Sequence, residues 1–307
     1  MEKTMKVVKP RERTTNTYTE NGKPIVAKVP HFNGDYLPET VKSAAELLGG
    51  LDKAFSPGDR VLLKPNFNCR YAMPLSTNLD FLSALLELLL DYGLKVTVGE
   101  SSGKADGPTR EVVKDLGVLP ILKRYGVPFV DFEEDQWLEM EVPGLYWKKI
   151  HVPKSIYEAD KRVYAANMRC HNSARFSASL KLSVGWINME DRGYLHEERP
   201  LTEHKVGDLN LGWQPDLVFI DGRRTTNTQS GRGPYIYPNI VMASGDMVAV
   251  DSEALRVLRT FPGENLLGIP LEEMGQIKTS LHHGLGSIEA VLREAEAHTE
   301  TEQKSRF

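Results

Sequence analysis

Five side chains that can bind anions or move protons lie in one short stretch near the middle of the chain: Arg169, His171, Lys181, Arg192 and His196. Histidine exchanges protons and binds metals near neutral pH, and lysine serves as a base, a Schiff-base former or an anion clamp. We expect His171, Lys181 and His196 to be catalytic. The two histidines would act either as acid and base or as metal ligands. Arg169 and Arg192 are predicted to hold a carboxylate or phosphate. The alternative is a hydrogen-bonded core histidine among surface charges, and the spacing matches no closed zinc motif.

A loop rich in glycine follows at residues 230–234. Glycines let backbone N–H groups converge on an anion, and arginine adds bidentate donors. Arg232 and Gly233 are therefore predicted to bind substrate, with a flexible surface loop as the alternative. The loop lacks the Gly-Lys-Ser/Thr ending of a P-loop, and no dinucleotide fingerprint follows a strand. A nicotinamide dinucleotide is therefore disfavoured as cofactor.

Two carboxylates, Asp246 and Asp251, lie at a predicted strand-to-helix junction. They are site carboxylates if they receive arginines or a metal. They are structural if Asp246 caps the helix and Asp251 lies in its first turn.

The elements that must position these groups follow a strand–helix–strand pattern. Apolar runs at 60–65 and 95–100 indicate strands, and the segment at 78–92 between them indicates a helix. This pattern predicts an α/β fold with a mainly parallel sheet and crossover helices. Such a fold allows two lobes around a cleft.

Ligands of parallel sheets bind beyond the carboxyl ends of the strands. The loops that follow the two predicted strands are therefore expected to form part of the site. They supply Glu100 as a second base, and Lys64, Asn66, Ser101 and Ser102 as substrate-binding residues.

The chain divides into three parts by composition. Residues 1–23 are predicted to form a polar arm that adds little to the core, because few of its residues are large and apolar. Residues 24–299 are predicted to form the α/β body, with a seam near 133–150. The body should end in an amphipathic helix at 287–298, and residues 300–307 should form a polar tail.

Composition limits the classes of function. The chain has 307 residues, a net charge of −4 and two cysteines, Cys69 and Cys170. A built-in iron–sulfur cluster is not expected, because it needs about four cysteine ligands. No apolar run approaches the ~18 residues of a membrane span, and no signal peptide is evident. We expect a cytoplasmic protein without nucleic-acid or membrane partners, able to form a homo-oligomer.

The order of these motifs resembles the family called domain of unknown function 362. The segments that carry the resemblance are VLLKPN at 61–66, VTVGESS at 96–102, MRCH at 168–171, LK at 180–181, DR at 191–192, His196, VFIDG at 218–222, GRGP at 231–234 and ASGDMVAVD at 243–251. The similarity spans about residues 58–286. Many members of this family carry a cysteine-rich ferredoxin segment, which is absent here. The family usually has Lys-x-Lys-Thr-His where this chain has NMRCH at 167–171.

The order His171, Lys181, His196 also resembles that of the nickel-pincer lactate racemase family. In that family a lysine anchors a pyridinium-derived cofactor, and histidines bind nickel or move protons. The resemblance implies an enzyme acting on a small anionic substrate by proton or hydride transfer, epimerase-like and assisted by a divalent transition metal in one version. The alternative is a non-catalytic metal- or cluster-related protein that serves a redox partner.

Overall fold

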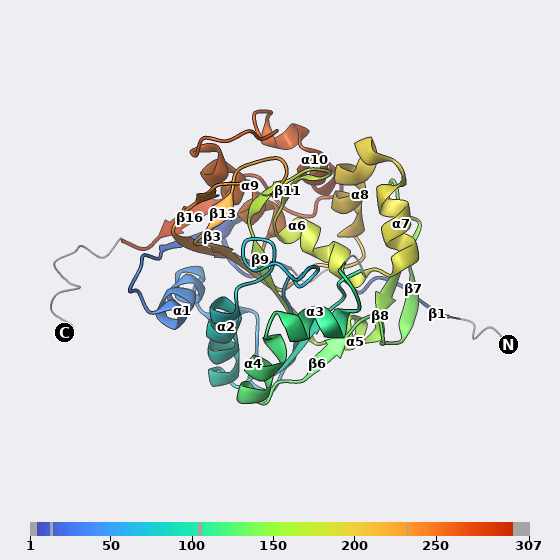
Figure 1. The fold of residues 1–307 in the computed structure, drawn as a ribbon, viewed down its shortest axis with the longest axis horizontal. Coiled ribbons are helices and arrows are strands. Elements are labelled where there is room, and N and C mark those ends of the chain that lie inside the picture. Colours follow the sequence, from blue (N-terminus) through green and yellow to red (C-terminus); the bar gives the residue numbers. More distant parts are fainter. Residues whose placement is uncertain (1–4, 13–14, 104–105, 232, 297–307) are drawn as a thin grey trace.

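The computed structural model describes residues 5–12, 15–103, 106–231 and 233–296. Within these ranges the chain forms one nine-stranded sheet (Figure 1). Its strands, from one edge to the other, are β16 (Val291–Glu294), β3 (Lys23–Pro30), β15 (Ile240–Ser244), β12 (Leu217–Gly222), β9 (Lys161–Asn167), β4 (Arg60–Lys64), β5 (Lys95–Glu100) and β6 (Phe129–Asp131), with β2 (Thr19–Glu20) paired to β3.

The sheet is mainly parallel, as predicted. Every neighbouring pair along the sheet is parallel except the two pairs made by β15, which runs against both β12 and β3. The short strand β2 is also antiparallel to β3. The α/β class expected from the strand–helix pattern is therefore confirmed.

Helices cover both faces of the sheet. Successive residues of β12 show this, because Leu217 and Phe219 pack into one core cluster, and Val218 and Ile220 pack into another. Strands buried on both faces are typical of parallel sheets with crossover helices. The first face carries α1 (Leu37–Leu48), α2 (Leu79–Asp91), α3 (Thr109–Asp115) and α4 (Val118–Tyr125), and the second carries α6 (Ser179–Leu182), α9 (Met247–Arg259) and α10 (Gly275–His282).

A smaller sheet joins the arm to the body. The arm strand β1 (Lys6–Val8) pairs in parallel with β7 (Trp137–Glu141), which pairs antiparallel with β8 (Lys149–Pro153). This sheet shares a third core cluster with residues of α7 (Met189–Glu197) and α8 (Thr202–Leu209). The stretch 133–150 contains β7 and the first residues of β8. The seam expected there stays a prediction.

The remaining elements are short. They are α5 (Lys154–Glu158), β10 (Arg169–His171) paired with β11 (Arg175–Ser177), β13 (Thr225–Thr226) paired with β14 (Tyr235–Ile236), and 3-10 turns at Leu51–Lys53, Ser183–Trp186, Arg199–Leu201 and Leu271–Glu273. No helix in the described ranges is long and apolar enough to cross a membrane.

Two expectations at the chain ends were wrong. The arm adds to the core, because Tyr18 is 1% exposed and Val8 is also buried. The amphipathic helix expected at 287–298 is not formed, because Val291–Glu294 instead extends the sheet beside β3. Backbone pairing with an open sheet edge outweighs a weak helical pattern. Residues 297–307, including the predicted tail, lie outside the described residues.

Candidate functional site

The order of strands creates a switch point between β4 and β9. From β4 the chain adds β5 and β6 on one side, and later adds β9 and β12 on the other. In open α/β sheets the crevice beyond the carboxyl ends of the strands at such a point is the usual ligand site. A cavity of about 50 Å³ lies there. Figure 1 shows β9 near the centre of the molecule, with α6 beside it.

Six of the predicted site residues line this switch-point cavity: Lys64, Asn66, Glu100, Arg169, Lys181 and Arg192. Lys64 and Glu100 are the last residues of β4 and β5, Lys181 belongs to α6, and Arg192 belongs to α7. Residues that are far apart in the sequence therefore meet in one cavity, as expected from the convergence of loops at the strand ends.

Lys64 and Glu100 form a buried ion pair across the ends of β4 and β5. Lys64 Nζ lies 2.7 Å from Glu100 Oε1, and each side chain is 1% exposed. Glu100 also accepts hydrogen bonds from the backbone N–H groups of Ser101 and Phe67, at 2.7 and 2.8 Å. Burial lowers the pKa of Lys64, and the charge of Glu100 opposes that shift. Both carboxylate oxygens of Glu100 therefore already have partners. This arrangement favours a structural role for Glu100, holding Lys64 and the loop backbone, over the role of a free base.

A close backbone approach completes this part of the wall. Gly185 lies in the turn after α6, and a Cβ there would lie 2.4 Å from Lys64 Nζ and 2.6 Å from Glu100 Oε1. Only glycine lets the chain pass this near the ion pair.

Arg192 reaches the cavity from α7 and is held by the loop after β5. Its Nη2 donates to Ser101 O at 2.8 Å and to Ser101 Oγ at 3.0 Å. Ser102 instead donates to Gly107 O at 2.9 Å. The two serines do not line the cavity. Ser101 thus holds Arg192 in the wall, and the binding of substrate by the two serines stays a prediction.

The helix that carries Arg192 is fixed to the smaller sheet by a neighbouring carboxylate. Asp191 Oδ2 accepts from His151 N at 2.6 Å, and Asp191 Oδ1 lies 3.1 Å from His151 Nδ1. The Asn188 side chain caps the helix by accepting from Asp191 N. The hydrogen bond with Asp191 raises the pKa of His151.

Asp251 positions Lys181 from a distant element. It accepts from Ser179 N at 2.9 Å, Ser179 Oγ at 2.6 Å and Leu180 N at 2.9 Å, and so satisfies the first turn of α6. Burial raises the pKa of Asp251 to about 7 in spite of these donors. Asp246 caps its own helix α9 through Ala249 N at 2.9 Å. Neither carboxylate lines the cavity. Asp246 caps its helix as the structural alternative expected, whereas Asp251 lies beyond the first turn of α9 and binds the first turn of α6 instead.

Lys181 is the most unusual group in the cavity. Its amine has no hydrogen-bond or ion-pair partner in the described part of the chain. Burial lowers the pKa of Lys181 to about 7, and the positive charges of Arg169 and Arg192 add to the shift. An ordinary lysine has a pKa near ~10.4, so fewer than about one in a thousand is neutral at pH 7. Here about half of the Lys181 amines are neutral at that pH.

Arg169 gives the cavity a second cation with spare donors. It is 7% exposed, its Nη1 donates to Cys170 O at 3.1 Å, and its buried Nε has no partner in the described residues. Burial lowers the pKa of Arg169. A buried guanidinium without a counter-ion favours an anion from outside the chain.

Neither predicted catalytic histidine lines the cavity. His171 Nδ1 accepts from Ser173 N at 3.2 Å. Burial, and then the charge of Lys181, hold the pKa of His171 far below its usual range, so the ring is neutral at physiological pH. His196 is exposed on α7, and partial burial followed by the charge of Lys181 lowers its pKa too.

The loop at 230–234 approaches the site through a different glycine from the one predicted. Gly233 is exposed and does not line the cavity. Gly231 lies against Arg169, because a Cβ there would be 2.5 Å from Arg169 Nη1. Arg232 lies outside the described residues.

Sequence reasoning missed two asparagines in the cavity wall. Asn68 and Asn167 line it, and each has a buried side-chain oxygen without a partner among the described residues. Asn167 is the last residue of β9, as Lys64 is of β4. Applying the strand-end rule to β9 could therefore have found it.

The donor set does not fit the metal and cofactor implied by the racemase resemblance. Within the described residues, no three or more His, Cys, Asp or Glu side chains are placed to hold a metal ion. The chemistry proposed below therefore uses only the side chains of this chain.

Comparison with known proteins identifies the family. The chain belongs to the family described as Domain of unknown function (DUF362), whose profile matches residues 61–256. A thylakoid-associated protein of Synechocystis sp. is 24% identical over 241 residues, which cover 75% of this chain and 73% of that protein.

Two solved structures are also similar to the chain. The lactate racemase apoprotein of Thermoanaerobacterium thermosaccharolyticum has a TM-score of 0.41 and 15% identity, over 68% of this chain and 52% of its own. A structural-genomics protein of Thermotoga maritima has a TM-score of 0.42 and 14% identity, over 62% of this chain and 51% of its own. The chain thus spans about half the length of each.

The cytoplasmic location and the homo-oligomer stay predictions.

Proposed function

We propose that this chain is an enzyme that binds a small carboxylate- or phosphate-bearing molecule in the switch-point cavity and moves a proton to or from it. The observation that carries the proposal is Lys181, a lysine in the cavity wall with a pKa of about 7 and with no partner among the described residues. A general base or acid works best when its pKa lies near the operating pH.

The charges around the cavity favour an anionic ligand. Arg169, Lys181 and Arg192 line it, whereas Glu100 is the one carboxylate in the described wall and is paired with Lys64. Cations in a partly desolvated site attract carboxylate or phosphate oxygens and can form bidentate hydrogen bonds with them.

The two asparagines in the cavity wall limit the chemical class of the ligand further. The side-chain oxygens of Asn68 and Asn167 are acceptors that have no partner in the described part of the chain, so they favour a ligand that also carries a hydroxyl or amine donor. A small hydroxy or carboxy compound meets both requirements. The arginines would hold its anionic group, and Lys181 would then face the neighbouring atoms.

Side chains of this chain can supply both the base and the positive charges that the proton transfer needs. A neutral Lys181 amine takes a proton from a C–H bond next to a carbonyl or carboxyl group, and becomes an ammonium. The electron pair stays on the substrate, where Arg169 and Arg192 stabilise the negative charge. Return of the proton from Lys181 to the face that it left restores the carbon, and return after the planar carbanion has turned over in the cavity inverts it.

Affinity selection tests ligand binding without knowledge of the substrate. We expect purified protein mixed with a small-metabolite extract, passed over a desalting column and analysed by mass spectrometry to retain carboxylate- or phosphate-bearing compounds. Lys181→Gln should lose most of this retention, because the neutral amide removes a cation. Lys42→Gln is the matched control, since Lys42 is exposed on α1, pairs with the exposed Glu46 and does not line the cavity.

Two results of this experiment would count against the proposal. One is retention of neutral or cationic compounds alone. The other is equal retention by the wild-type chain and Lys181→Gln.

A further inference from the structure

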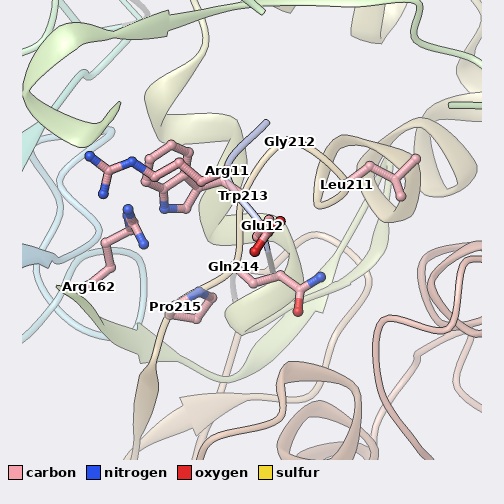
Figure 2. Close-up of a pocket in the computed structure, with 8 residues that line it drawn as sticks. All are labelled: Arg11, Glu12, Arg162, Leu211, Gly212, Trp213, Gln214 and Pro215. Atoms are coloured by element: carbon pink, nitrogen blue, oxygen red, sulfur yellow. The ribbon is translucent and has the colours of Figure 1, made fainter. Parts of the chain in front are cut away.

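A second cavity, of about 40 Å³, lies at the opposite end of β9 from the switch point, and we name it the arm cavity (Figure 2). Three of the residues that line it come from different elements. Arg162 lies near the amino end of β9, Trp213 lies in the segment before β12, and Arg11 belongs to the arm. In Figure 2 these three side chains gather on one side, whereas Leu211 lies on the other.

Arg162 keeps an unused donor group in this cavity. It is 6% exposed and stacks on the Trp213 ring, with its guanidinium carbon 3.6 Å from the ring centroid. Its Nε and Nη2 donate to Ile156 O and Ala159 O, at 3.4 and 3.2 Å. Its Nη1 lies 3.9 Å from Asp216 Oδ2, which is too far for a hydrogen bond.

Trp213 and Arg11 add further donors. Trp213 is 4% exposed, and its buried Nε1 has no partner in the described residues. Arg11 stacks on the Tyr157 ring at 5.4 Å and donates from Nη1 to Ala159 O at 2.8 Å. The other nitrogens of Arg11 have no partner in the described chain. A buried indole N–H normally finds an acceptor, so an external one is expected here.

The charges of the cavity are not fully compensated from within. Burial lowers the pKa of Arg162 to about 10, and the nearby charge of Arg11 adds to this shift, while the carboxylates of Asp216 and Asp160 oppose it. Asp160 is itself paired with Arg60. The Asp216 carboxylate is shared with the backbone N–H of Arg162 at 2.8 Å and with Lys161 at 3.4 Å. Glu12 also lines the cavity but is exposed to solvent.

We propose that the arm cavity binds a small oxyanion, of the size of a phosphate or a carboxylate group, through the guanidinium groups of Arg162 and Arg11 and the indole N–H of Trp213. The bound anion would connect the arm to the body, because Arg11 belongs to the first and the other two residues to the second. The site is separate from the switch-point cavity, which lies at the other end of β9.

The indole N–H resonance of Trp213 reports on this site alone. It can be assigned in an ¹H–¹⁵N spectrum by its loss in Trp213→Phe. We expect it to move saturably when phosphate or acetate is added at constant ionic strength, but not when chloride is added. Arg11→Gln should weaken the binding by about tenfold or more, because it removes a charge-assisted donor. Arg11 is exposed, so this variant should fold.

Two variants serve as controls. Arg110→Gln removes an exposed arginine of α3 that pairs with Glu134 and does not line the cavity, and it should bind as the wild-type chain does. Lys181→Gln should also bind normally, because it alters only the switch-point cavity. Movement with phosphate alone, or with acetate alone, assigns the preferred anion. A resonance that neither anion moves, or equal affinities of the wild-type chain and Arg11→Gln, would overturn the proposal.

Discussion

Replacing Lys181 with arginine should keep the affinity of the switch-point cavity for its anion within about tenfold, yet slow proton transfer by about 10²–10⁴-fold. Arginine retains the positive charge but cannot release its proton near neutral pH. The rate is measured as incorporation of deuterium from D₂O into the C–H bonds of the compounds retained in affinity selection. Lys181→Gln should lose both binding and exchange.

The comparison of the two substitutions separates the two roles of Lys181. An arginine variant that exchanges deuterium at the wild-type rate would show that a group other than Lys181 is the base. Lys42→Arg, on the exposed face of α1, controls for general effects of the change.

Breaking the Lys64–Glu100 pair should produce the largest loss of stability. We expect Lys64→Met or Glu100→Gln alone to lower the free energy of unfolding by about 3–5 kcal/mol, because each leaves a buried partner uncompensated. The double variant should recover much of the loss, since both buried charges are then gone. Urea unfolding of the four proteins measures the coupling between the two positions.

An exposed ion pair at the other end of β4 is the matched comparison. Arg60 lies 2.7 Å from Asp160, and both side chains are well exposed. Arg60→Gln should cost only about 0–1 kcal/mol, because water screens such pairs. A similarly small cost for Lys64→Met and Glu100→Gln would contradict the anchoring role of the buried pair.

The sequence was most informative where one physical rule governs many residues. Parallel strands end at the same edge of a sheet, so the positions of Lys64 and Glu100 in a shared cavity could be predicted from two apolar runs. The clustering of Arg169, Lys181 and Arg192 was likewise expected, because they follow closely along the chain. The rule was not extended to β9, and Asn167 was therefore missed.

The sequence could not predict which side chain near the cavity, Lys181 or His171, titrates near neutral pH. Histidine titrates near neutral pH in water, and lysine does not. Burial reverses this order. Together with the charges of Arg169 and Arg192 it lowers the pKa of Lys181 to about 7, and together with the charge of Lys181 it drives the pKa of His171 far lower. These shifts depend on packing between elements that the sequence pattern does not place.

The role of Asp251 shows the same limit. It satisfies the first turn of α6 from 72 residues further along the chain. From the sequence it could be expected only to belong to the beginning of its own helix. Residues 287–298 likewise gave a helical pattern, but the open edge of β3 takes up Val291–Glu294 as a strand.

Direct titration of the Lys181 amine tests the central claim. The chain can be labelled with ¹³C at lysine Cε, and the Lys181 signal assigned by its loss in Lys181→Arg. We predict that its chemical shift titrates with a midpoint near pH 7, and that an anion retained by the cavity moves the midpoint upward by stabilising the ammonium form. A midpoint above about 10, the range of an ordinary lysine, would contradict the assignment of Lys181 as the group that exchanges the proton.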